Sequence, residues 1–264
     1  MQMIVGGWSK KPMLLILALV LLAVLAMQQR AMARACAEER FEGTGYIVCT
    51  FDPATSNLRL FWKNADGEPY RSFSNVGAAL RDQGKELVFA ANAGMYQADF
   101  SPLGLYIENG RQLRPADTGS VDGPPAQVPN FYKKPNGVFF LGATGAGILE
   151  TAAFIAAQMG VRYATQSGPM LVIENALHPA LIPGSTDRRR RSGVGVCENG
   201  VVRFAISDGA VNFHDFARLF RDRLACPNAL FLDGGHGAGL YLPEAERNDF
   251  SWHGGYGPIL GLVE

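Results

Sequence analysis

The hydrophobic pattern of the chain consists of short apolar runs separated by glycine, proline, asparagine and other turn residues. Residues 46–51 and 58–62 alternate between apolar and polar positions, as paired strands do. Asn199-Gly200 separates two later runs and predicts a hairpin turn between them. The predicted strands, all of them short, cover residues 46–51, 58–62, 86–91, 103–108, 137–141, 193–197, 201–207, 229–232 and 259–263, and residues 164–173 contain a further one.

Three other stretches have the capping residues or the apolar spacing of helices. The predicted helices, each counted from its capping residue, run from Ser72 or Ser74 to Leu80, from Thr151 to Met159 and from Asn212 to Leu224. Strands outnumber helices, and their connections are irregular. The pattern therefore predicts an α+β fold, a single domain with a large mixed β-sheet and a few helices.

Composition sets the size of the fold and excludes one class of partner. The chain has 264 residues, of which 48% are hydrophobic and 18% charged, enough for one large core. Its formal net charge is zero, so the chain lacks the excess of positive charge that would indicate a nucleic-acid partner. There is no heptad pattern or internal repeat.

The N-terminus has the features of a targeting segment. Lys10 and Lys11 precede an apolar run over residues 13–27, and Ala33-Arg34-Ala35 matches a small-residue cleavage site. The run is short for a membrane span, which needs about 20 apolar residues. We expect a signal peptide over residues 1–35 and a mature domain over 36–264, periplasmic or secreted. A retained anchor is the alternative, and this segment is the only expected contact with a membrane.

The four cysteines all lie in the expected mature part. An even number in an exported chain predicts two disulfides. Three pairings are open, and the pairing of neighbouring segments, Cys36 with Cys49 and Cys197 with Cys226, is favoured. No C-x-x-C motif and no histidine spacing matches a metal or redox site, so we expect neither a metal nor a cofactor.

Four segments share one arrangement, in which an apolar strand is followed by a polar residue and then glycine. They are Asn92-Ala93-Gly94, Ser167-Gly168, Ser207-Asp208-Gly209 and Asp233-Gly234-Gly235. Glycine allows backbone to approach a ligand closely. Each segment alone is typical of a turn. If their strands are neighbours, however, the polar groups converge on one site.

A run of four arginines and several aromatic residues add candidate binding groups. Arg188, Arg189 and Arg190 are typical of a solvated loop, whereas Arg191 directly precedes an apolar strand. An arginine fixed at a strand start can offer two parallel donors to phosphate or carboxylate. His236 is the histidine within a candidate segment. The aromatic residues that could stack on a sugar ring are Tyr96, Tyr132, Tyr241 and Trp252.

The order of these motifs over residues 45–263 resembles the phosphodiester glycosidase family. The motifs are Asn92-Ala93-Gly94-Met95-Tyr96, Ser167-Gly168-Pro169, Arg191-Ser192-Gly193-Val194-Gly195, Ser207-Asp208-Gly209 and Leu232-Asp233-Gly234-Gly235. The family includes the lysosomal enzyme that removes N-acetylglucosamine from a phosphodiester. The resemblance implies that the site is lined by Asn92, Gly94, Arg191, Asp208, Asp233 and Gly234. The chain departs from the family at Gly234-Gly235-His236-Gly237, where Gly-Gly-Gly-Ser is usual.

The resemblance implies hydrolysis of a glycosyl phosphodiester in a glycan or glycolipid. The leaving phosphate monoester is a stable anion, so it needs charge stabilisation more than a proton. We expect Asp233 to act as base or nucleophile, Arg191 to hold the phosphate and Asp208 to orient water or sugar. The expected substrate-binding positions are Asn92, Gly94, Tyr96, Ser167, Gly168, Gly234, Gly235 and His236.

Two other functions are open from the sequence. The first is a non-catalytic glycan-binding or envelope-assembly protein, such as one for exopolysaccharide, that uses the same cleft. The second is a hydrolase in which His236 and a carboxylate form the general base. A ligand between Arg191 and Asp233 would separate these functions most directly.

Overall fold

Three β-sheets form the framework of the protein, and a computed structural model describes residues 35–124 and 127–264 of it. These described residues contain 17 strands and three α-helices, which confirms the predicted α+β class. Instead of one large mixed sheet, there are three sheets in which neighbouring strands run antiparallel. Antiparallel strands can be joined by short turns, whereas parallel strands need long, usually helical, crossovers.

The order of the strands across each sheet differs from their order along the chain. The seven-stranded sheet runs β1 (Cys36–Phe41), β2 (Thr44–Phe51), β13 (Val202–Ser207), β12 (Arg191–Val196), β14 (Asn228–Gly234), β10 (Met170–Ile173) and β11 (Ala176–Leu177). The second sheet runs β16 (Arg247–Asn248), β15 (Leu240–Leu242), β4 (Leu87–Asn92), β17 (Ile259–Val263) and β3 (Leu58–Phe61). The third runs β6 (Arg111–Arg114), β5 (Tyr106–Glu108), β9 (Tyr163–Ser167), β7 (Gly137–Gly142) and β8 (Gly145–Glu150).

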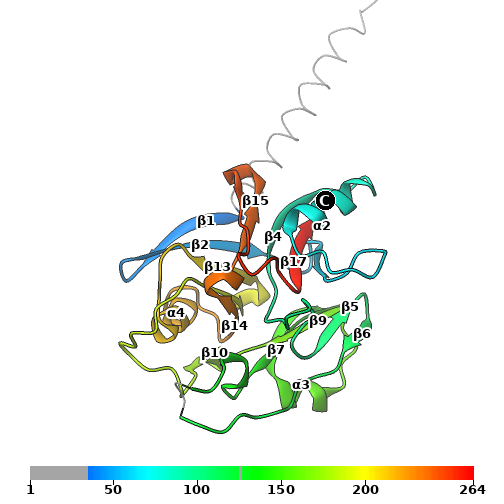
Figure 1. The fold of residues 1–264 in the computed structure, drawn as a ribbon. Helices are drawn as coiled ribbons and strands as arrows, with labels where there is room; N and C mark the ends of the chain where they lie inside the picture. The colour runs from blue at the N-terminus through cyan, green and yellow to red at the C-terminus, as the bar shows by residue number, and fades with distance from the viewer. Residues whose placement is uncertain (1–34, 125–126) are drawn as a thin grey trace, which may run out of the picture. The chain divides into compact units, whose positions relative to one another are not determined.

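Each sheet packs against one helix (Figure 1). Helix α4 (Phe213–Arg218), continued by a π-helical turn over Leu219–Arg223, packs on the seven-stranded sheet. Helix α2 (Phe73–Arg81) packs on the second sheet and α3 (Thr151–Ala157) on the third. Because each helix buries its apolar residues on its own sheet, the other sheet faces are free to meet one another.

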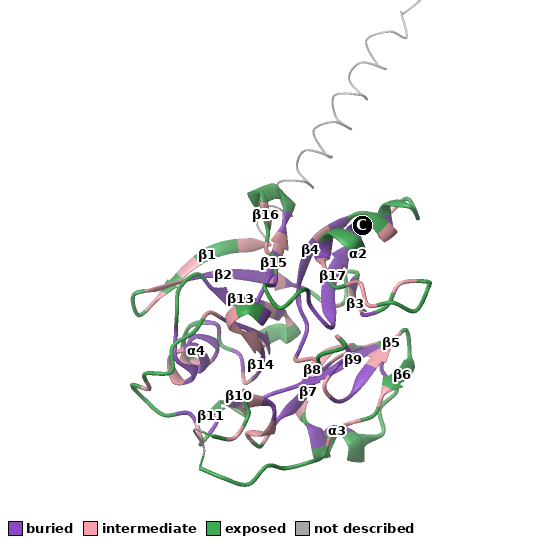
Figure 2. Cartoon of the chain, viewed as in Figure 1, coloured by how far each residue is buried: buried purple, intermediate pink, exposed green. Residues whose placement is uncertain are grey.

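Four phenylalanines join the three sheets at the centre. Phe51 and Phe204 come from the seven-stranded sheet, Phe89 from the second and Phe139 from the third. Their ring centroids lie 4.8 Å (Phe51–Phe89), 5.6 Å (Phe89–Phe204) and 6.0 Å (Phe139–Phe204) apart. Figure 2 shows the buried residues concentrated in the strands around this junction. The strand ends that carry the predicted site residues are therefore anchored in the core.

Two of the three predicted helix caps are confirmed. Ser72 Oγ accepts a hydrogen bond from Asn75 N–H at 3.1 Å, and Asn212 Oδ1 accepts one from Asp215 N–H at 2.8 Å. The predicted cap at Thr151 is wrong, because Thr151 is already the first residue of α3. Its buried hydroxyl instead donates to the side chain of Asn136, so tertiary packing uses the group that sequence spacing assigned to the cap.

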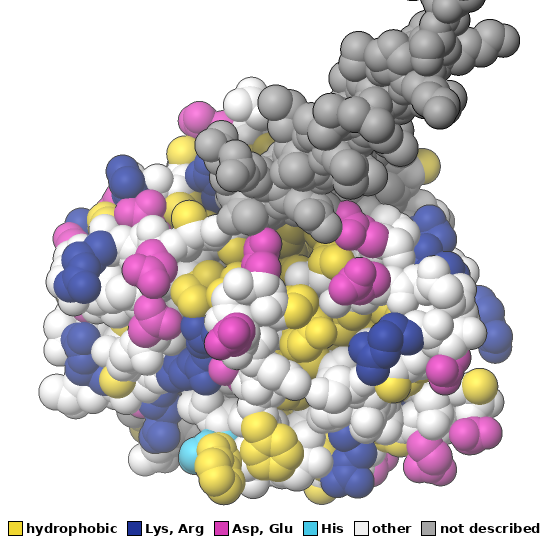
Figure 3. Space-filling model, turned by 90° about the horizontal axis from the view of Figure 1, so that it is seen from above, with side chains coloured by type: hydrophobic (Ala, Val, Ile, Leu, Met, Phe, Trp, Pro, Cys, Tyr) yellow, Lys and Arg dark blue, Asp and Glu magenta, His cyan; other side chains and the backbone are white. Residues whose placement is uncertain are grey.

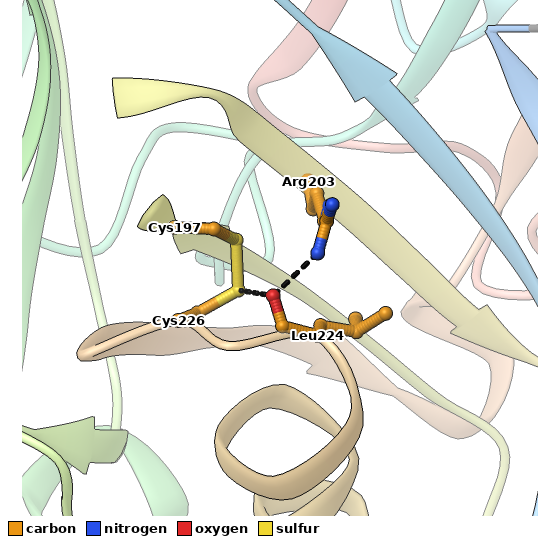
Figure 4. The surroundings of a disulfide bond; sticks show 4 residues. All are labelled: Cys197, Arg203, Leu224 and Cys226. Atoms are coloured by element: carbon orange, nitrogen blue, oxygen red, sulfur yellow. Dashed lines mark hydrogen bonds between the residues drawn. A yellow bond between two sulfur atoms is a disulfide. The ribbon is translucent and has the colours of Figure 1, made fainter. Parts of the chain in front are cut away.

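The predicted pairing of Cys197 with Cys226 is confirmed (Figure 4). This disulfide joins the end of β12 to the start of β14, and Arg203 donates a hydrogen bond to Leu224 O beside it. Gly195 lies directly below, since a Cβ there would come 2.8 Å from Cys226 Sγ. Cys36 and Cys49 are also disulfide-bonded, and no cysteine of the described residues is free.

The expected signal peptide lies outside the described residues, apart from its last position. Residues 38–264 form one compact unit. Across 35–124 and 127–264, no helix has the length and hydropathy needed to cross a membrane.

Candidate functional site

A bulge in β14 determines the direction in which Asp233 points. Ser192 on β12 lies opposite Asp233, while Gly193 lies opposite Phe231, so Leu232 is an extra residue on β14. Residues directly opposite each other share a face of the sheet. Phe231 therefore faces α4 together with Gly193, whereas Asp233 faces the other side together with Ser192.

The carboxylate of Asp233 is half-buried and lies against backbone. Gly234 N–H donates to Asp233 Oδ1 at 2.7 Å, and a Cβ on Gly237 would come 2.1 Å from Oδ2. Burial raises the pKa of Asp233 to about 7, although the hydrogen bond from Gly234 opposes the shift. At neutral pH both protonation states are therefore populated, which suits a carboxyl group that gives or takes a proton.

Tyr96 lies close enough to Asp233 for the two groups to interact. Tyr96 Oη donates to Gly255 O at 2.8 Å. Burial raises the pKa of Tyr96, a hydrogen bond with Ser251 opposes this, and the charge of Asp233 adds to the increase. The predicted binding residue Tyr96 is thus brought to the candidate catalytic carboxylate by the segment that follows β4.

Arg191 is fixed at the start of β12, but its guanidinium is enclosed by protein groups rather than open to a ligand. Its side chain is 1% exposed and faces α4, with the guanidinium carbon 3.6 Å from the centre of the Phe213 ring. Nε donates to Val211 O at 2.9 Å, and Nη2 donates to Asp187 O at 3.0 Å. Burial lowers the pKa of Arg191 to about 10, opposed by Asp187. The register places this guanidinium on the opposite face of the sheet from the carboxylate of Asp233.

Asn92 and Ser167 are also buried, and both bind backbone. Asn92 Oδ1 accepts from Gly239 N–H at 3.1 Å, and Ser167 Oγ donates to Leu232 O at 3.0 Å. Gly94 contacts the same strand end, because a Cβ there would lie 3.7 Å from the Cβ of Ser167. The segments are therefore neighbours as predicted, but these two side chains hold the backbone in place.

The predicted site glycines at positions 168, 234 and 235 lie where backbone packs closely. A Cβ on Gly168 would come 2.6 Å from Asn136 Cβ, and one on Gly234 would come 3.1 Å from Arg190 O. Gly235 has φ +60°, and its N–H donates to Arg190 O at 2.8 Å. These contacts fix the loop after Asp233 against the residue that precedes β12.

The fourth glycine-flanked segment joins the others through its serine. Ser207 Oγ accepts from Arg191 N–H at 3.0 Å. The next side chain, that of Asp208, is 51% exposed, with Oδ1 3.4 Å from Nη1 of Arg247. Asp208 is therefore at the edge of the group, in an ion pair with an arginine that the sequence pattern did not single out.

Two arginines share one carboxylate beside the Asp233 loop. Arg190 Nη2 donates to Asp249 Oδ2, and Arg247 Nε lies 3.2 Å from Asp249 Oδ1. Leu240 N–H also donates to Asp249 Oδ2 at 3.0 Å. Burial raises the pKa of Asp249, but the hydrogen bonds from Arg247 and Arg190 outweigh this effect and hold the pKa below its usual value. The carboxylate therefore stays ionised and fixes both arginines.

The predicted residue His236 contacts a loop that carries exposed rings. Its ring centroid is 5.2 Å from that of His253. Phe250 and Trp252, on the same loop as His253, are 65% and 78% exposed, and their rings lie 5.8 Å apart. Figure 3 shows hydrophobic side chains projecting beside a histidine on the face seen from above. Flat exposed rings are suited to contact with sugar rings.

Among residues 35–124 and 127–264, no group of three or more His, Cys, Asp and Glu side chains is placed to hold a metal ion. The groups that the arrangement brings together are the carboxyl of Asp233, whose raised pKa suits proton transfer, the fixed arginines and the exposed rings.

Comparison with known proteins defines the family. The sequence model of the phosphodiester glycosidase family matches residues 85–256, which include Asn92 and Asp233. The chain is 34% identical over 185 residues to Uncharacterized protein YigE of Escherichia coli strain K12, covering 70% of each chain. The chain belongs to the phosphodiester glycosidase family.

Solved structures share the fold at low sequence identity. One is the zebrafish N-acetylglucosamine-1-phosphodiester alpha-N-acetylglucosaminidase catalytic domain, auto-inhibited by its pro-peptide. It matches with a TM-score of 0.58 and 14% identity, covering 86% of this chain and 81% of that chain. A hypothetical protein from Synechocystis matches with a TM-score of 0.51 and 16% identity, covering 86% and 61%.

Sequence reasoning missed Arg190, Asp249 and Gly237. Arg190 was assigned to the solvated part of the arginine run, and Asp249 lies 59 residues away from it. Gly237 differs from an ordinary turn glycine because it touches the Asp233 carboxylate. The sequence does contain one signal for Arg190. Side chains alternate along an extended chain, so Arg190 and Arg191 are expected on opposite faces of the sheet.

Proposed function

We propose that this member of the family is an exported glycosidase that hydrolyses a glycosyl phosphodiester in a glycan or glycolipid. It releases the sugar from a phosphate monoester. The observation that carries the proposal is Asp233, whose pKa is raised to about 7 within the segment that matches the family. The name of the zebrafish protein, an N-acetylglucosamine-1-phosphodiester alpha-N-acetylglucosaminidase, supports the substrate class.

In the proposed reaction, ionised Asp233 takes a proton from water as the water oxygen attacks the anomeric carbon. The bond between that carbon and the bridging oxygen breaks, and the oxygen leaves with the electron pair on the phosphate monoester. Because this leaving group is a stable anion, no acid has to protonate it, and one carboxylate is sufficient. The pKa of Asp233 allows it to accept the proton at neutral pH.

The other predicted residues divide into contact and positioning roles. We assign contact with substrate to Asp208, Tyr96 and His236, whose polar or aromatic groups border the site. The exposed rings of Phe250 and Trp252 extend this surface for sugar contact. Arg191 is assigned a positioning role, because its buried guanidinium supports the ends of β12 and β14. The remaining residues shape the backbone around Asp233: Asn92, Gly94, Ser167, Gly168, Gly234 and Gly235.

Export is part of the proposal. Two disulfides are typical of proteins that fold in an oxidising compartment outside the cytoplasm. The expected signal peptide over residues 1–35 accounts for delivery there. N-terminal sequencing of protein isolated from the periplasm or medium tests the cleavage, which is expected near Cys36.

Hydrolysis in H₂¹⁸O tests the bond that is cleaved. A glycosyl phosphodiester is incubated with the protein, and the phosphate monoester product is analysed for ¹⁸O by ³¹P NMR. Cleavage at the sugar carbon leaves the phosphate unlabelled, which is the expected result. Label in the phosphate would identify a phosphodiesterase and overturn the proposal. Binding without turnover would favour the glycan-binding alternative.

A further inference from the structure

The four consecutive arginines occupy four different environments. Arg191 is buried, and Arg189 is 68% exposed, with Nε 3.2 Å from Asp187 Oδ1. Arg188 donates to Ala210 O on the surface. Arg190 lies between these extremes, with its side chain 28% exposed and bound to Asp249. Only Arg190 of the four combines partial exposure with a carboxylate anchor that is itself only 19% exposed.

Arg190 lies beside the catalytic loop. Its carbonyl oxygen accepts the N–H of Gly235 at 2.8 Å, two residues after Asp233. Successive residues of an extended chain point to opposite faces. Since Arg191 points toward α4, Arg190 points to the other side of the sheet, the side of Ser192 and Asp233.

The guanidinium of Arg190 is oriented but not saturated. Within the described residues, Nη2 binds Asp249, while Nε and Nη1 make no hydrogen bond. Asp249 is itself held by Leu240 N–H and by Arg247, and Arg247 also faces Asp208. The two arginines share Asp249, and Arg190 is the one of the two that has no second carboxylate.

Two buried polar atoms next to this network lack a partner in the described part of the chain. They are Asn92 Nδ2 and Tyr256 Oη. Both residues contact Gly239, since its N–H donates to Asn92 Oδ1 and a Cβ on it would come 2.1 Å from Tyr256 Oη. Unsatisfied buried donors are rare and often mark functional sites.

We propose that Arg190, positioned by Asp249, binds the phosphate group of the substrate. This assignment rests on the proposed function for the identity of the substrate, and it gives Arg190 the contact that the sequence assigned to Arg191. A planar guanidinium held at one nitrogen can present its remaining N–H groups to two phosphate oxygens. It stabilises the negative charge on the leaving phosphate monoester.

Binding of inorganic phosphate tests the proposal without requiring turnover. Thermal unfolding of the full chain is followed against phosphate concentration at constant ionic strength, for wild type, Arg190→Gln and Arg189→Gln. Arg189→Gln is a matched control, because it removes the adjacent, more exposed charge. We expect wild type and Arg189→Gln to be stabilised equally. Loss of the charge-assisted contact in Arg190→Gln should weaken phosphate affinity by about tenfold to a hundredfold.

Two further variants test whether the position of the Arg190 charge matters as well as its presence. Asp249→Asn keeps Arg190 but removes its anchoring charge, so it should also weaken phosphate binding. Arg190→Lys, which keeps the charge, should lose less affinity than Arg190→Gln. Equal phosphate responses in Arg190→Gln and Arg189→Gln, or no response in wild type, would overturn the proposal. If the protein binds phosphate through Arg190 but leaves glycosyl phosphodiesters intact, the phosphate site is supported and the proposed hydrolysis is overturned.

Discussion

Gly237 lies directly against the carboxylate of Asp233, so close that a Cβ at position 237 would come 2.1 Å from Oδ2. The contact occurs where β14 has ended and the chain has turned back in a short 3₁₀ segment. Any side chain at this position would displace the carboxylate. The glycine that follows His236 is therefore required by the packing of the candidate catalytic group.

Gly237→Ala is expected to move Asp233 while leaving the fold intact. Position 237 is not among the residues with positive φ, so alanine is allowed by the backbone, and the clash falls on a side-chain end. A displacement of about 1 Å can lower turnover by about a hundredfold. Gly160→Ala is the control, because nothing lies within 4 Å of its Cβ position. Wild-type kcat in Gly237→Ala would show that the position of Asp233 does not matter.

The raised pKa of Asp233 predicts a pH-dependent cost to stability. The folded protein holds this proton with a pKa of about 7, against 3.8 for an ordinary aspartate. The stabilisation by the bound proton is fully present below about pH 4 and is lost as the pH rises through 7. Asp233→Asn avoids this loss, so its stability relative to wild type should rise between pH 4.5 and 8 by more than about 1 kcal/mol. Urea unfolding of both proteins at the two pH values measures the difference, and a constant difference would contradict the shift.

The Cys197–Cys226 disulfide should contribute substantially to stability. It closes a loop between residues 29 apart and joins the two strands that carry Arg191 and Asp233. Removing such a crosslink typically costs about 2–4 kcal/mol. We expect Cys197→Ser/Cys226→Ser to unfold at lower denaturant concentration than wild type. Thiol labelling of unfolded, unreduced wild-type protein provides the check on pairing, and reactive thiols there would contradict the disulfides.

The sequence could predict which segments meet, because apolar runs identified the strands that deliver them. It could not predict where the side chains point. Alternation alone would place Phe231 and Asp233 on the same face, and the bulge at Leu232 separates them. The burial of Arg191 depends on Phe213 of α4, and the orientation of Arg190 depends on the distant Asp249. Such long-range contacts have no local signature in one sequence.

The most direct test of the account is the turnover of a glycosyl phosphodiester by wild type and Asp233→Asn. The substitution keeps the shape of the side chain and removes its ability to take a proton. General base catalysis contributes about 10²–10⁴-fold, and kcat should fall by that factor in a protein that remains folded by circular dichroism. Wild-type kcat/KM should also rise with pH through about 7 as Asp233 ionises. Full activity in a folded Asp233→Asn protein would contradict the central claim that Asp233 carries the reaction.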